Sequence, residues 1–116
     1  MKKILVLAAM AISVIILSNC HASKKAAAAS AHKSYYEANV KTLITDKCSP
    51  CHIPARGGTK KAFDSYEAAK ENIDSMISRI EKNPGEKGFM PFKKPKLSDT
   101  AIAVFKQWRD EAVMEK

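Results

Sequence analysis

The 116-residue sequence lacks four patterns that would define other kinds of protein. No segment shows a convincing run of alternating polar and apolar residues, so nothing supports a β-sheet. No second Cys/His pair stands at a spacing suited to a four-ligand zinc site, and the strand–helix–strand units of a thioredoxin-like protein are missing. The apolar run from Ile4 to Leu17 is shorter than the ~20 residues that a membrane-spanning helix needs.

That apolar run follows two lysines and precedes a processing sequence, an order that predicts a signal peptide at residues 1–19. Two processing routes stay open. Leu17–Cys20 resembles a lipobox, which favours lipidation of Cys20, whereas Cys20–Ala22 would instead serve a conventional signal peptidase. We therefore expect an exported protein on the periplasmic side of a cell-envelope membrane, either held there by a lipid on Cys20 or soluble in the periplasm.

The net charge of the whole chain is +8, and the expected signal contributes only Lys2 and Lys3, which leaves +6 for the rest. Nucleic acid is not the expected partner of an exported protein. The positive charge instead favours acidic redox proteins or anionic lipid head groups.

Helical periodicity predicts an all-α fold with three amphipathic helices. The first is expected over residues 34–46. The second begins with a capping box formed by Asp64 and Glu67 and ends at Asn83–Gly85, and the third begins with Ser98 as its N-cap. The predicted apolar faces comprise Tyr36, Val40, Leu43 and Ile44 in the first helix, Tyr66, Ala69, Ile73, Met76, Ile77 and Ile80 in the second, and Ala101, Phe105, Trp108 and Ala112 in the third.

The segment of residues 20–34 is rich in alanine and lysine and has no apolar periodicity. It is interpreted as a flexible tether that precedes a folded domain at residues 35–116. The alternative is that its alanines extend the first helix toward the N-terminus.

Residues Cys48–His52 form a C-x-x-C-H pentad, the attachment signature of a c-type haem. Two thiols three positions apart can each add to one haem vinyl group, and the histidine that follows is then held beneath the iron. The alternative is a disulfide between Cys48 and Cys51, which would close a very small ring and leave His52 unexplained. Cys20 is the one remaining cysteine, so it calls for acylation, intermolecular pairing or removal with the signal.

With the pentad after the first helix, a Met90–Pro91 pair in a Gly/Pro-rich loop and Trp108 in a closing helix, the chain resembles a short single-haem class I c-type cytochrome from about Tyr35 to Val113. The resemblance implies three main helices wrapped around one covalent haem c attached to Cys48 and Cys51. His52 and Met90 would be the axial iron ligands. The implied function is single-electron transfer in the cell envelope, and the protein is not expected to be an enzyme.

Several other residues are alternatives to Met90 as the sixth ligand of the haem iron. Met76 lies within an apolar stripe, where methionine is usually core filler. Met10 falls in the signal and Met114 near the C-terminus, while His21 and His32 fall in the tether, from which His32 could reach an open iron. An open sixth site would favour a haem sensor or a peroxidase-like enzyme, but no distal acid/base constellation supports it.

Two further features of the sequence bear on the site. Lys87, Lys93, Lys94 and Lys96 flank Met90, and we interpret them as a docking patch for an acidic redox partner, with simple solvation of the surface as the alternative.

His52 is followed by Ile53–Pro54, whereas the family commonly uses a proline carbonyl farther downstream to accept a hydrogen bond from the second imidazole nitrogen. Which carbonyl accepts that hydrogen bond is left open.

Overall fold

The computed structural model describes residues 23–113, and within this range the regular secondary structure is entirely helical. A first α-helix at residues 23–35 continues without a break into the π-helix η1 (Tyr36–Val40) and then α2 (Lys41–Lys47). The 3₁₀-helix η2 (Pro54–Arg56), α3 (Tyr66–Ile80) and α4 (Asp99–Val113) follow. The predicted all-α class with three main helices is confirmed.

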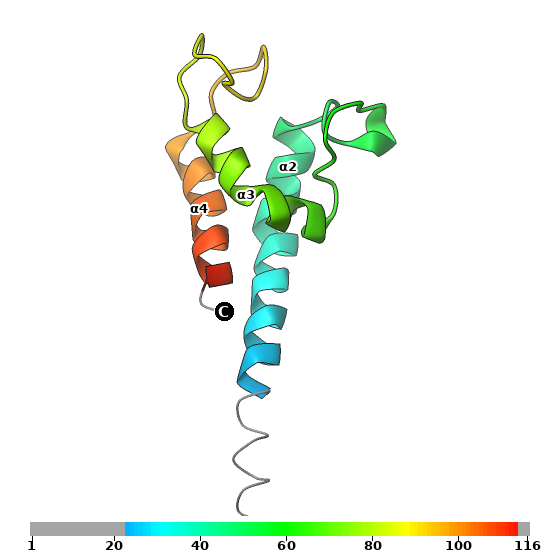
Figure 1. Ribbon diagram of the computed structural model, residues 1–116, viewed down its shortest axis with the longest axis vertical. Coiled ribbons are helices and arrows are strands. Elements are labelled where there is room, and N and C mark those ends of the chain that lie inside the picture. Colours follow the sequence, from blue (N-terminus) through cyan, green and yellow to red (C-terminus); the bar gives the residue numbers. More distant parts are fainter. Residues whose placement is uncertain (1–22, 114–116) are drawn as a thin grey trace, which may run out of the picture.

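Figure 1 shows how these elements are arranged. α4 runs antiparallel to the long first helix, and α3 crosses the bundle obliquely and contacts α4. The loop after α2 and the loop between α3 and α4 both lie at one end of the molecule, whereas the first helix begins at the other end. No helix among residues 23–113 is both long enough and apolar enough to cross a membrane.

The first helix extends farther toward the N-terminus than expected, because residues 23–34 are helical instead of a flexible tether. The four consecutive alanines Ala26–Ala29 have the highest helix propensity of any residue type. In addition His32, placed in the tether by the sequence, is only 2% exposed and is part of the core. The structure therefore agrees with the alternative of a helical extension, while Cys20, His21 and Met10 lie outside the described residues, as does Met114.

The buried face of the first helix has a strict spacing of four residues: His32, Tyr36, Val40 and Ile44. In a regular α-helix with 3.6 residues per turn, positions four apart drift around the axis by about 40° at each step. The π-helical turn Tyr36–Val40 is wider and counteracts this drift. It keeps all four side chains on the face that packs against α3 and α4.

The core of the bundle is built around Trp108, which is fully buried, and Phe105, which is 1% exposed. Met76 is 5% exposed and packs in the same core, which confirms its prediction as core filler. Ile102 joins the buried face of α4, whereas Ala101 is only partly buried and the side chain of Ala112 lies outside the described set.

Of the two predicted helix N-caps, the one at α4 is confirmed and the one at α3 is wrong. Ser98 Oγ accepts a hydrogen bond from the Ala101 N–H at 3.2 Å, as predicted. At α3, however, the cap is Ser65, whose Oγ accepts from the Ala68 N–H at 3.2 Å. The predicted capping box at Asp64 is wrong because Ser65, which has extended backbone angles, is the residue directly before the first helical residue.

Candidate functional site

The C-x-x-C-H pentad begins where α2 ends. The Cys48 N–H still donates to the Ile44 carbonyl at 2.9 Å, and the His52 N–H donates to the Cys48 carbonyl at 3.1 Å. A further turn closes with the Ile53 N–H donating to the Pro50 carbonyl at 3.0 Å. These bonds coil the five residues tightly, so that both thiols and the imidazole project from one compact turn.

The loop that follows wraps back over the pentad. The Lys60 N–H donates to the Cys51 carbonyl and the Phe63 N–H to the His52 carbonyl, both at 3.0 Å. Gly58 lies so close that a Cβ atom added to it would stand 2.3 Å from the Pro50 carbonyl oxygen. The loop therefore clamps the pentad backbone, and a side chain at position 58 would break the clamp.

The His52 ring is held in one orientation. Its Nδ1 lies 2.7 Å from the Lys61 carbonyl oxygen, and the ring stacks on Phe63 with centroids 4.4 Å apart and planes 9° apart. Because a carbonyl can only accept, Nδ1 carries the hydrogen and the neutral ring has its lone pair on Nε2. This identifies Lys61 as the source of the carbonyl left open by the sequence, and it leaves Nε2 as the nitrogen able to bind a metal ion.

The two pentad cysteines are both free thiols, so the alternative disulfide between them is not formed. Cys48 is partly buried and packs against the core, whereas Cys51 is exposed. Burial raises the pKa of the Cys48 thiol to about 11, and the positive charge of Lys94 only partly offsets this. Cys48 is therefore protonated at neutral pH.

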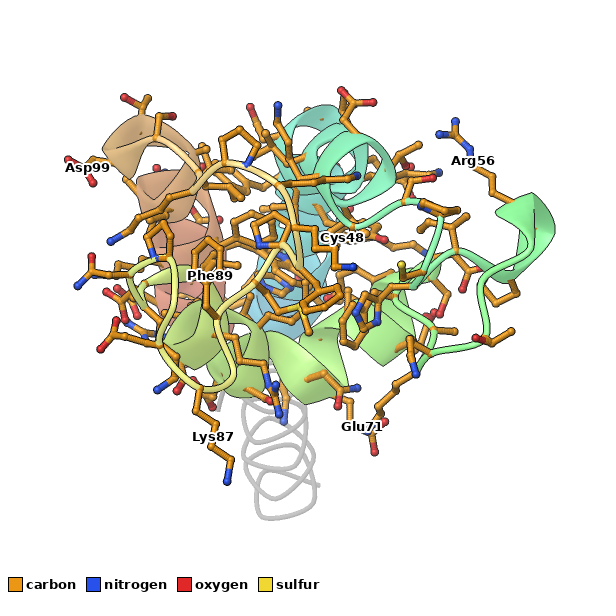
Figure 2. All side chains as sticks on the ribbon, turned by 90° about the horizontal axis from the view of Figure 1, so that it is seen from above. Cys48, Arg56, Glu71, Lys87, Phe89 and Asp99 are labelled. Atoms are coloured by element: carbon orange, nitrogen blue, oxygen red, sulfur yellow. The ribbon has the colours of Figure 1, made fainter. Side chains whose placement is uncertain are left out.

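Met90 lies in the loop between α3 and α4, which is irregular as predicted. Its side chain is partly buried and packs against the hydrophobic core, and its N–H donates to the Arg79 carbonyl at the end of α3 at 3.2 Å. Figure 2 looks onto the loop end, where Cys48 lies near the centre of the view, between Phe89 of the Met90 loop and Arg56 of the loop after the pentad.

A lysine joins the Met90 loop to the pentad. Lys94 Nζ donates to the Ser49 carbonyl at 2.6 Å and to the Lys47 carbonyl at 3.5 Å. The structure thus brings the loop of Met90 to the same end of the bundle as Cys48, Cys51 and His52, although Met90 follows His52 by 38 residues in the chain.

The four lysines of the predicted docking patch do not have equal roles. Lys94 bonds the pentad backbone, and Lys96 Nζ donates to Asn83 Oδ1 at 3.1 Å. Lys87 and Lys93 are exposed, and Lys93 has its Nζ 5.3 Å from the Phe92 ring centroid. Phe92 is 66% exposed, the most exposed large hydrophobic side chain among residues 23–111, and sequence analysis missed it because exposure follows from the loop conformation.

The sixth-ligand alternatives are also placed by the structure. Met76 is in the helical core, and His32 is buried between helices, with both ring nitrogens engaged there. The position of His32 four residues before Tyr36 was the sequence signal for its burial.

Protein side chains alone do not form a metal centre in the described part of the chain, since no group of three or more His, Cys, Asp or Glu residues there could hold an ion. No protein-family model matches the sequence, and neither does any curated protein or solved structure with which it was compared.

Proposed function

We propose that this protein is a single-electron carrier that holds one covalently attached haem c, with His52 and Met90 as axial iron ligands. The observation that carries the proposal is the C-x-x-C-H turn with His52 Nδ1 fixed by the Lys61 carbonyl and Nε2 left for iron. The proposed fold is accordingly cytochrome c-like, with the helices and both loops packed around the haem.

The residues present fit such a group. Two free thiols lie in one turn with the imidazole, and the loop that carries Met90 is bonded to the same turn through Lys94. Cys48 and Cys51 would hold the haem covalently, because each S–H could add across one vinyl double bond, with sulfur bonding to one carbon and hydrogen to the other and no net oxidation. A bound haem would supply an iron that alternates between the ferrous and ferric states.

Electron transfer is favoured over ligand binding by the chemistry of Met90. A thioether is a neutral, soft ligand, and His/Met ligation raises the reduction potential of a haem. If His52 and Met90 both bound the iron, no coordination position would remain for a substrate. Among residues 23–113 the loop around Met90 offers no histidine that would act as a distal acid or base.

The proposed partners are acidic redox proteins. The two loops at the pentad end, residues 48–65 and 81–98, carry eight basic and three acidic residues, a net charge of +5, whereas α3 and α4 together carry four basic and six acidic residues. Such an uneven distribution orients an acidic partner toward the positive end before contact. Phe92 adds an exposed aromatic ring there, of the kind enriched at interface centres.

The proposed location is the periplasmic side of a cell-envelope membrane, with a lipid on Cys20 as the anchor. This part of the proposal is supported by the residues 1–20, which have the order of a lipoprotein signal. Mass spectrometry of the membrane fraction tests it, because a diacylated N-terminal cysteine has a characteristic added mass. A mature chain that begins after Cys20 contradicts lipidation without affecting the haem.

Optical spectroscopy tests the haem proposal directly. We expect the chain expressed with a cytochrome c maturation system to carry covalent haem and, when oxidised, to show the weak band at about 695 nm of methionine-ligated ferric haem. Met90→Ala should abolish the band and allow carbon monoxide to bind the ferrous form. Met76→Leu is the matched control, because Met76 is core filler and its replacement should leave the band in place.

Each outcome has a distinct meaning. Covalent haem without the band, together with ready carbon monoxide binding in the unaltered protein, would replace the electron carrier with a sensor or peroxidase-like protein. Absence of covalent haem would overturn the assignment of Cys48 and Cys51.

A further inference from the structure

His32 is a buried titratable residue that the proposed haem site does not use. It is 2% exposed, its Nε2 lies 2.8 Å from the Trp108 carbonyl oxygen, and its Nδ1 lies 2.6 Å from the Tyr66 hydroxyl oxygen. Because the carbonyl can only accept, Nε2 carries the hydrogen, and Nδ1 of the neutral ring accepts from the hydroxyl. One side chain thus bonds the first helix to both α4 and α3.

Ring packing reinforces the two hydrogen bonds. The His32 ring stacks on Trp108 with centroids 5.1 Å apart and planes 11° apart, and it meets Tyr66 edge-on at 5.6 Å. Tyr36, one turn later, contacts the same two rings at 5.1 Å and 5.4 Å. Two successive turns of the first helix are therefore fixed to the same two neighbouring helices, which opposes bending between residues 32 and 36.

Beyond His32, residues 23–31 project as helix with almost no packing contact, since all are exposed except Ala28, which is partly buried. An isolated helix of this length would be unstable because nucleation is costly. Here the helix grows from turns already fixed by His32 and Tyr36, so no new nucleus is needed. The alanines at 26–29 then favour its continuation.

We infer that the helix from residue 23 to Lys47 is a rigid arm, locked by His32, which holds the pentad end at a fixed distance from the N-terminal side of the chain. At about 1.5 Å per residue the arm is roughly 37 Å long. Figure 1 shows the start of the first helix and the two loops at opposite ends. The rigidity of the arm is inferred from its own contacts, whereas its role in electron transfer rests on the proposed function.

The arm determines what kind of surface the loop end meets. The proposed lipidation site, Cys20, precedes Ser23 by three residues, so a membrane anchor would lie at the end of the arm opposite the pentad. The basic loop end would then point away from the lipid. The partner of the loop end is therefore an acidic protein surface at a distance from the membrane. A flexible tether would instead allow the loop end to reach the membrane surface around the anchor.

Amide hydrogen exchange on the full mature chain tests the lock. We expect amides of residues 26–31 to be protected in the unaltered protein and to exchange at least about tenfold faster in His32→Ala, because the bonds to α3 and α4 are lost. Ser30→Ala is the matched control, since Ser30 is exposed on the same helix and alanine is the better helix former, so its replacement should not accelerate exchange. Amides of α3 report separately whether the variant remains folded.

A distance measurement gives a second readout. Spin labels can be attached to keto-bearing amino acids introduced at positions 25 and 87. The distance between the two labels should have one narrow distribution, which His32→Ala broadens. If His32→Ala does not fold, His32→Gln retains an N–H donor for the Trp108 carbonyl and should give an intermediate width. Unprotected amides at 26–31, or a broad distribution in the unaltered protein, would overturn the rigid arm. Both readouts are independent of haem, so a failure of covalent attachment is recorded separately.

Discussion

Lys94 connects the two loops that the proposed haem site needs, through one hydrogen bond of 2.6 Å to the Ser49 carbonyl. We predict that Lys94→Gln lowers the free energy of unfolding by about 1 kcal/mol, the usual net contribution of a hydrogen bond, with no larger effect because the site is solvent-exposed. In the haem-loaded protein the same change should weaken methionine ligation and increase carbon monoxide binding.

Urea unfolding and carbon monoxide titration measure these two effects. Lys93→Gln is the control, because it removes the same charge from the neighbouring position, where the ammonium group lies over the Phe92 ring instead of bonding the pentad. Equal effects of the two substitutions would show that Lys94 acts through charge alone.

The two pentad thiols differ in environment, and their reactivity should follow. In the haem-free chain carrying Cys20→Ser, we predict that iodoacetamide alkylates the exposed Cys51 first at pH 8. Cys48 should react more slowly, with a rate that rises with pH up to its pKa of about 11, because the thiolate is the reactive form. Peptide mass spectrometry separates the two products.

The raised pKa of Cys48 also predicts how stability depends on pH. The folded state favours the protonated thiol, so the contribution of Cys48 to the free energy of unfolding is fully present below about pH 9 and is lost as the pH rises toward about 11.

In the alkylation experiment, unfolding the chain in urea should make the two thiols equally reactive. Equal reactivity before unfolding would contradict the burial of Cys48.

At the scale of elements, the start of α3 tests which residue caps the helix. Ser65→Ala should lower the free energy of unfolding by about 1 kcal/mol because the bond to the Ala68 N–H is lost. Asp64→Ala should cost clearly less, because Asp64 is not the capping residue. Thermal or urea unfolding of the two variants decides between them, and a larger loss for Asp64→Ala would restore the capping box.

The elements also show what pattern could and could not predict. The apolar faces of α3 and of the segment containing Val40 and Ile44 were predicted because their spacing is helical. The start of the first helix was misplaced because Ala26–Ala29 carry no amphipathic signal, although they favour helix. The π-turn at Tyr36–Val40 leaves no mark in the sequence except the strict spacing of four residues.

At the scale of the whole molecule, the charge on the loop end is predicted to control association with an acidic partner. The double substitution Lys87→Glu and Lys93→Glu should reduce the low-salt association rate several-fold, and high salt should remove most of the difference. Both side chains are exposed and neither bonds the pentad, in contrast to Lys94. Stopped-flow reduction or surface binding on a carboxylate-terminated monolayer provides the measurement.

The matched control places the same charge change at the other end of the molecule. Lys24→Glu with Lys25→Glu alters the net charge equally, but on the exposed N-terminal part of the arm. If both double variants slowed association equally, net charge would be responsible and the loop end would not be a docking surface.

The helical class, the pentad and the proposed role of Met90 could be predicted from the sequence, because they depend on local spacing and on residue chemistry. The supporting groups could be found only in the folded chain: the Lys61 carbonyl on His52, Lys94 on Ser49 and His32 on α3 and α4. Each of these contacts joins residues 9 to 76 positions apart. Such contacts depend on how the chain folds back on itself, which residue spacing along one helix does not specify.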